Sequence, residues 1–115
     1  MSRPDDRGTA TVEAALVIFS LALVLGLGSA AVVAVVDQLR CTDAAREAAR
    51  LIARGEPARA ESVLTTIAPS GARLEVSTDG DTVRVAVTST PANGLLPGVH
   101  LKATAYAVLE PTTDD

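Results

Sequence analysis

One uninterrupted apolar stretch constrains this chain more than any other feature of its sequence. From Ala14 to Val36, 23 consecutive residues carry no charge, and only two serines and two glycines interrupt the apolar side chains. At about 1.5 Å per residue, a helix of this length crosses the roughly 30 Å hydrocarbon core of a bilayer. The sequence therefore predicts one membrane-spanning helix near the N-terminus.

The rest of the chain, residues 37–115, is small for a domain that folds alone. It contains no Trp or Phe, and Ala and Val supply most of its apolar side chains. Domains of this size usually rely on a disulfide, a metal or a partner subunit. Cys41 is the only cysteine and His100 the only histidine, which excludes an internal disulfide and a metal site built on histidines. We therefore expect assembly with other subunits, and no metal or cofactor.

Helix-forming sequence continues beyond the apolar stretch. Residues 1–8 are polar and are expected to form a leader without a fold of its own. The helical pattern runs from Thr11 to Arg54, and residues 37–54 are amphipathic. Gly55 and Pro57 are expected to end this helix, the glycine as its C-cap. The charged stripe of the amphipathic half contains Asp37, Arg40, Asp43, Glu47, Arg50 and Arg54. We interpret Arg46, Arg50 and Arg54 as a solvated face with Glu47 rather than an anion site.

A short helix and a sheet are expected after Gly55. The helix covers about residues 58–68, with an apolar face at helical spacing. Period-two alternation then predicts a hairpin around Asp79-Gly80. With those two residues as the loop, Val76 faces Val83 and Leu74 faces Val85. A third strand is expected over about 99–110. The inward residues are expected to be Leu74, Val76, Val83, Val85, Leu101 and Ala103, packed on the helix face with Ala45, Ala48 and Ile52.

These elements define an α+β fold class. It consists of a long N-terminal helix with a membrane half and an amphipathic half, a short second helix, and a three-stranded antiparallel sheet over about residues 72–110. One face of the sheet must be covered, and the amphipathic half of the long helix is the obvious cover. The predicted organisation is a leader over 1–8, a membrane and assembly helix over 9–36, and a small domain over 37–115.

The residues just before the apolar stretch carry the strongest functional signal. Gly8 and Thr9 precede Glu13, and the apolar run begins directly afterwards. A carboxylate at the start of a membrane helix is costly unless it lies at the interface or has a partner. If the chain is cut after Gly8, the new amine of Thr9 lies one helical turn from Glu13, within one chain or between neighbouring chains. Glu13 can also be an ordinary interfacial carboxylate.

This arrangement resembles the type III signal sequence of type IV pilins. The segments RGTATVEAALV and LRCTDAAREAARLIARG are similar to those of TadE-like minor pilins, or pseudopilins, of the tight-adherence pilus system. The resemblance implies a pilin-like fold, with Gly8 as the last leader residue, Thr9 as the first mature residue and Glu13 as the residue that guides assembly. It also implies three partners: a prepilin peptidase, other pilin subunits and an inner-membrane assembly platform. Asp5 and Asp6 depart from the usual leader pattern because they offset Arg3 and Arg7.

The orientation in the membrane has to be weighed between two signals. The count of Lys and Arg near the span literally places the C-terminal domain in the cytoplasm. Acidic residues are interleaved among those arginines, however, and the pilin resemblance requires the N-terminus inside and the C-terminal domain outside. We expect the latter, in a single-pass protein of the cytoplasmic membrane that reaches the pilus or the cell surface.

Two other function classes compete with a pilus subunit. A secreted or surface protein with an ordinary signal peptide could be cut after Gly28-Ser29-Ala30, so that it begins near Ala31. A simple single-span membrane protein is the other alternative. An enzyme is not expected, because no catalytic residues form a nucleophile and base pair, and no phosphate-binding glycine loop is present. The net charge of −4 and the lack of a basic patch argue against nucleic-acid binding.

Overall fold

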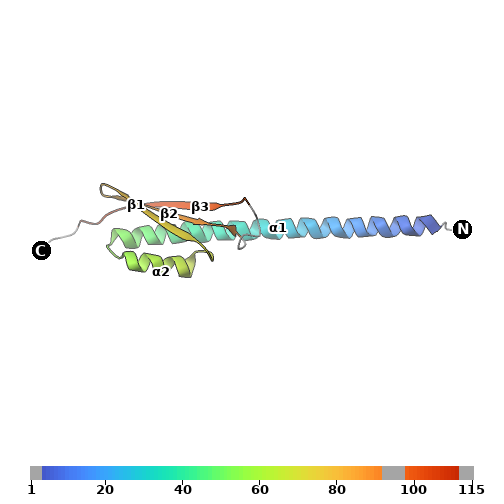
Figure 1. Cartoon of the computed structure of the whole chain (residues 1–115), viewed down its shortest axis with the longest axis horizontal. Helices are drawn as coiled ribbons and strands as arrows, with labels where there is room; N and C mark the ends of the chain where they lie inside the picture. The colour runs from blue at the N-terminus through green and yellow to red at the C-terminus, as the bar shows by residue number, and fades with distance from the viewer. Residues whose placement is uncertain (1–3, 92–97, 112–115) are drawn as a thin grey trace. The chain divides into compact units, whose positions relative to one another are not determined.

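The computed structural model describes residues 4–91 and 98–111, and it has the predicted α+β architecture (Figure 1). The elements are α1 (Pro4–Ala53), α2 (Pro57–Ile67), β1 (Arg73–Asp79), β2 (Thr82–Ser89) and β3 (Leu101–Val108). The chain divides into two compact units, Met1–Val32 and Val33–Asp115. The first unit holds the N-terminal part of α1, and the second holds the rest of α1 with α2 and the sheet.

The helix α1 begins earlier than the sequence pattern predicted. Its first residue is Pro4, so the part of the expected leader from Pro4 to Gly8 is helical, and the expectation of no fold there was wrong. Residues 1–3 lie outside the described part of the chain. Proline at a first helical position has a suitable φ and needs no N–H partner. Asp5 and Asp6 lie in the first turn, where negative charge interacts favourably with the helix dipole.

The predicted C-cap of α1 at Gly55 is confirmed. Gly55 has a φ of +82°, a conformation that other residues adopt only with strain. Its N–H donates to the carbonyl oxygen of Ile52 at 2.9 Å, and the N–H of Glu56 donates to that of Leu51 at 2.9 Å. This pair of bonds is the Schellman arrangement, which satisfies carbonyl groups that the end of a helix leaves unpaired. The chain then starts α2 directly at Pro57.

The β1–β2 hairpin forms where it was predicted, but its register differs by two residues. Asp79 pairs with Thr82, so the loop is Gly80 and Asp81 rather than Asp79 and Gly80. Gly80 has a φ of +61° and takes the first loop position instead of the second. Val76 therefore pairs with Val85 instead of Val83. Because the shift is an even number of residues, every side chain keeps its predicted face.

The core of the second unit lies between α1, α2 and one face of the sheet. Strand order is β1-β2-β3, so β2 has neighbours on both sides and carries the most buried side chains. The buried cluster is Cys41, Ala44, Ala45, Ala48, Ala49, Leu51, Ala60, Ala68, Val83, Val85, Val87, Ala103 and Ala105. Most of these side chains are alanine and valine, and none is aromatic. Their small size allows the helices and the sheet to approach each other closely.

The predicted inward set is only partly correct. Val83, Val85 and Ala103 are buried as expected, whereas Leu74 and Leu101 are only partly buried. Val76 is 47% exposed, so its assignment to the core was wrong. It lies on β1, an edge strand with a neighbour on one side only, and less of the protein covers its inner face than covers β2. The third strand also begins later than predicted, at Leu101 rather than Val99.

Candidate functional site

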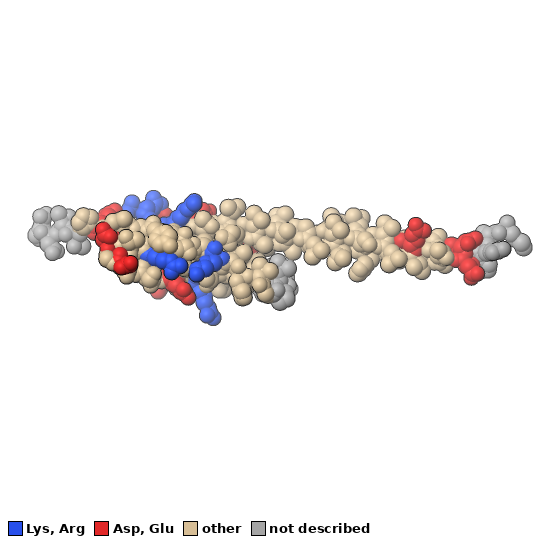
Figure 2. All heavy atoms as spheres, turned by 90° about the horizontal axis from the view of Figure 1, so that it is seen from above, with Lys and Arg blue, Asp and Glu red and all other residues tan. Residues whose placement is uncertain are grey.

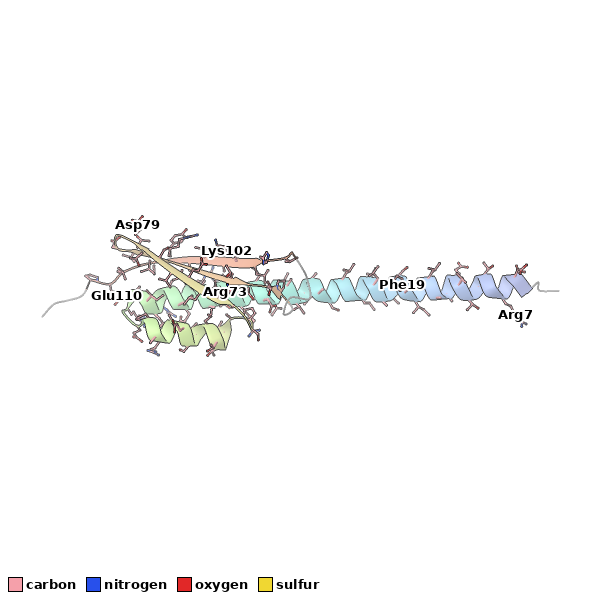
Figure 3. The ribbon with its side chains drawn as sticks, viewed as in Figure 1. Arg7, Phe19, Arg73, Asp79, Lys102 and Glu110 are labelled. Atoms are coloured by element: carbon pink, nitrogen blue, oxygen red, sulfur yellow. The ribbon has the colours of Figure 1, made fainter. Side chains whose placement is uncertain are left out.

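The N-terminal part of α1 presents apolar side chains to its surroundings on every face. The large apolar residues from Val12 to Leu27 are at least half exposed, among them Phe19 at 67%. Figure 2 shows the uncharged stretch as a continuous surface without Lys, Arg, Asp or Glu, and Figure 3 shows Phe19 projecting from the helix. A soluble surface helix keeps its apolar residues on one stripe facing a core. This helix is long and apolar enough to cross a membrane.

The polar side chains inside the apolar stretch have hydrogen-bond partners within the helix. The hydroxyl of Ser20 donates to the carbonyl oxygen of Leu16 at 2.8 Å, and that of Ser29 donates to Leu25 at 2.8 Å. A polar group without a partner in the hydrocarbon core costs several kcal/mol. These bonds give both serine hydroxyls an acceptor within the helix, without any neighbouring chain. The helix is therefore compatible with a lipid environment as it stands.

The predicted processing site lies on the first turns of α1. Gly8 and Thr9 are both exposed, and nothing lies within 4 Å of the position that a Cβ on Gly8 would occupy. The hydroxyl of Thr9 donates to the carbonyl oxygen of Asp5 at 2.9 Å. The Gly8–Thr9 peptide bond is thus accessible from outside and held in helical geometry. The helical turns around it must open before a protease can bind this bond in an extended conformation.

Glu13, the predicted assembly residue, lies near the start of α1. It lies four residues after Thr9 on the same helix, so both residues lie on one face. Its side chain is exposed and makes no hydrogen bond or ion pair with any residue that the structure describes. Apolar residues follow it directly along the helix. The carboxylate is therefore at the edge of the apolar stretch and accessible to a partner group.

The sequence pattern missed two polar side chains of α1 that tie the second unit together. The side chain of Gln38 donates to the carbonyl oxygen of Lys102 in β3 at 3.1 Å. Arg40 donates to the carbonyl oxygen of Ile67 in α2 at 2.9 Å. Arg40 was predicted only as a member of the charged stripe, in which neighbours pair along α1. Of that stripe, Glu47 and Arg50 do form an ion pair, at 2.5 Å. Long-range bonds of this kind leave no periodic signal in a sequence.

Cys41 lies on the packed side of α1, as predicted. It is fully buried among the alanines of the core. Burial raises the pKa of its thiol, and the nearby carboxylate of Asp37 raises it further, while Arg40 opposes both effects. The reactive form of a cysteine is the thiolate, which this environment disfavours. Within the described residues, no three His, Cys, Asp or Glu side chains form a group that could hold a metal ion.

Comparisons with known proteins find a named relative of the chain. No family model matches the chain, and no solved structure matches it. Over 100 residues, it is 49% identical to a protein of Mycobacterium tuberculosis (strain ATCC 25618 / H37Rv) named apoptosis inhibitor Rv3655c. The matched region covers 87% of this chain and 78% of the relative. At this identity and coverage, the chain belongs to the same protein family as the mycobacterial protein.

Proposed function

We propose that this chain is a minor pilin, or pseudopilin, of a tight-adherence type IV pilus. The observation that carries the proposal is the exposed, uncharged helix that directly follows Gly8, Thr9 and Glu13. The precursor is held in the cytoplasmic membrane by this helix, with its N-terminus inside. A prepilin peptidase then cuts after Gly8, and the assembly platform brings the helix into contact with other pilin subunits.

An apolar surface on all sides of one helix suits both stages of this route. In the membrane, each side chain faces lipid, and the backbone groups are satisfied within the helix. In a filament, a subunit at the centre of a bundle is surrounded by several neighbours, so it needs apolar residues on every face. A helix with a single apolar stripe would fit one partner only. The exposed side chains from Val12 to Leu27 meet this requirement.

The relative's name provides a second candidate function, inhibition of apoptosis. One structural observation favours a released protein that could carry such an activity. The second compact unit starts at Val33, two residues after Ala31, where an ordinary signal peptide would leave the mature chain. A cut there would leave the whole second unit intact, with its core of α1, α2 and sheet residues. The residue at which the mature chain begins therefore distinguishes the pilin from the released protein.

The experiment is to express the full chain with and without the prepilin peptidase of the same organism and to measure its intact mass in each fraction. We expect a membrane-bound product that begins at Thr9 and has 107 residues, the 115 of the chain less the eight of the leader. Gly8→Leu is the matched control. It leaves the helix intact, since the site is open, and should remain uncut. A soluble product that begins at Ala31 would instead support the released protein, and a wild-type chain left uncut by the peptidase would contradict the pilin proposal.

A further inference from the structure

The strand β3 has one edge that no other strand of the described residues covers. It pairs with β2 on one side, and it is the last strand of the sheet. An open edge presents unpaired N–H and C=O groups and can add a strand from another chain. Proteins usually protect such an edge with charges, prolines or bulges. Between Lys102 and Glu110, β3 carries only uncharged residues and no proline.

Three hydrogen bonds show which residues of β3 direct their backbone toward the open edge. The carbonyl oxygen of Lys102 accepts a bond from Gln38, and the N–H of Glu110 donates to the carbonyl oxygen of Ala53 at 3.1 Å, both on α1. The N–H of Leu109 instead donates to the carbonyl oxygen of Asp81 at 2.7 Å, on the β2 side. Backbone direction alternates along an antiparallel strand.

The same alternation applies to the residues between these bonds. Thr104, Tyr106 and Val108 lie an even number of residues from Lys102 and Glu110. Their N–H and C=O groups therefore point in the same direction, away from β2. No residue of the described chain provides a partner for these groups on that side. The two ends of this stretch are fixed to α1, while its middle is free to pair. Figure 3 labels Lys102 and Glu110, which mark the ends of the stretch.

A groove between α1 and β3 runs beside this free edge. Its lining from α1 is Arg46, Ala49, Arg50, Ala53 and Arg54, and its lining from β3 and the following residues is Ala105, Tyr106, Ala107, Val108 and Glu110. The small alanine side chains allow another backbone to approach closely, while the long arginines can reach over it. Arg50 is paired with Glu47, but Arg46 and Arg54 form no ion pair with any described acid. The groove is therefore positively charged on its helix side.

We propose that this groove binds an extended, acidic segment of another protein as a fourth strand on β3. The N–H and C=O groups of Thr104, Tyr106 and Val108 supply main-chain hydrogen bonds, as in other cases of strand addition. Carboxylates on the incoming strand pair with Arg46 and Arg54. Tyr106, which is 67% exposed, covers the outer face of the added strand. The proposal uses only the second unit and does not depend on the pilin assignment.

The positive charge of the groove distinguishes between an acidic segment and a second copy of the chain as its occupant. If β3 paired with β3 of another copy, the arginines of both copies would lie along the same new pair of strands. Like charges brought together in this way destabilise an interface. An acidic segment removes the repulsion and replaces it with charge-assisted hydrogen bonds. The groove therefore favours an acidic partner over self-pairing.

The test uses the full chain in detergent micelles and a fluorescein-labelled peptide, as long as β3, that alternates Thr and Glu. Binding is followed by fluorescence anisotropy. A peptide with Lys in place of each Glu should not bind. A third peptide keeps the glutamates but carries N-methyl groups at alternate residues, which block main-chain pairing. Loss of binding with this third peptide is expected, and unchanged binding would overturn strand addition.

Protein variants test the arginines. The double variant Arg46→Gln/Arg54→Gln should weaken binding of the Thr and Glu peptide about tenfold, since two charge pairs are lost. The matched control is Arg73→Gln, which removes an exposed arginine from β1, the opposite edge strand. Equal weakening of peptide binding in both variants would mean that only the net charge of the protein matters, and would contradict binding in the groove. Failure of the Thr and Glu peptide to bind, with hydrogen-exchange protection of 104–108 that rises with protein concentration, would assign the edge to a second copy instead.

Discussion

The guanidinium group of Arg40 in α1 donates a hydrogen bond to the carbonyl oxygen of Ile67, the last residue of α2, over 2.9 Å. A second N–H of the same group donates to Ala68 at 3.4 Å. The last carbonyl groups of a helix lack partners within it, and a cation at that end also interacts favourably with the helix dipole. Arg40 therefore fixes the end of α2 to α1.

Replacement of this arginine should loosen α2 before the rest of the unit. We expect Arg40→Ala to reduce the local stability of α2 by about 1 kcal/mol, since an exposed charge-assisted hydrogen bond to an otherwise unpaired carbonyl is lost. Hydrogen exchange of α2 amides in the full chain, measured by mass spectrometry, should accelerate about fivefold. Arg54→Ala is the matched control, because the side chain of Arg54 makes no hydrogen bond or ion pair with any described residue. Equal exchange in both variants would contradict the role of Arg40.

Two valines that pair across the hairpin should respond very differently to the same substitution. Val85 is completely buried, whereas its partner Val76 is 47% exposed. Val85→Asp places an unpaired carboxylate in the core, at a cost of several kcal/mol, and should unfold the second unit. Val76→Asp should cost about 1 kcal/mol or less, because water still reaches that side chain. Thermal melting of the full chain in detergent, followed by far-UV circular dichroism, compares them. Unfolding by both would support the originally predicted core.

The sequence was sufficient for the order and type of the elements because each has a strong periodic pattern. The hairpin was found from the alternation of Val83, Val85 and Val87, and the end of α1 from Gly55 and Pro57. The register was harder to predict, because Asp79-Gly80 and Gly80-Asp81 are both good two-residue loops. Neither choice changes which face is apolar. The pattern therefore could not decide between them.

The candidate sites also differ in how far the sequence alone could predict them. Gly8, Thr9 and Glu13 are close together in the sequence, so their spacing alone places them on the first turns of one helix. The groove beside β3 joins Arg46 and Arg54 to residues more than 50 positions later in the sequence, and only the tertiary structure shows which strand lies beside them. The exposure of Val76 likewise depends on strand order, which places β1 at an edge.

The buried thiol of Cys41 should make stability depend on pH in the alkaline range. Its pKa in the folded chain is raised above the ordinary value of 9.0, first by burial and then by Asp37. The unfolded chain therefore loses this proton at lower pH than the folded chain does. The protonated thiol therefore contributes its full stabilisation below the pKa that Cys41 has in the unfolded chain. This stabilisation is lost as the pH rises through the pKa that Cys41 has in the folded chain. Urea unfolding of the full chain at pH 7 and pH 10 should show a larger loss for wild type than for Cys41→Ala. An equal loss would mean that the thiol does not contribute.

Substitutions of Glu13 can distinguish a role in pilus assembly from simple anchoring in the membrane. A carboxylate at the edge of the apolar stretch is not needed for insertion, and an uncharged residue there would insert more easily. On the pilin proposal, the carboxylate of Glu13 becomes useful when packed helices exclude water and bring it close to the new amine of Thr9 on the same or a neighbouring chain. The attraction is stronger at low dielectric, but both charges also lose hydration, so on the pilin proposal the pair would fix the register of the helices more than their stability.

Glu13→Ala and Glu13→Gln should therefore leave membrane insertion, cleavage after Gly8 and folding of the second unit unchanged. Both should reduce co-purification with other pilin subunits from membranes, and Gln tests charge alone because it keeps the size of the side chain. Asp5→Asn is the matched control, since Asp5 is an exposed carboxylate of the same helix, and the proposed cleavage after Gly8 would remove it with the leader. Once cleaved, that variant should associate like wild type. Normal association of both Glu13 variants after normal cleavage would show that Glu13 is an ordinary interfacial residue, and the pilin proposal would lose its mechanism of assembly.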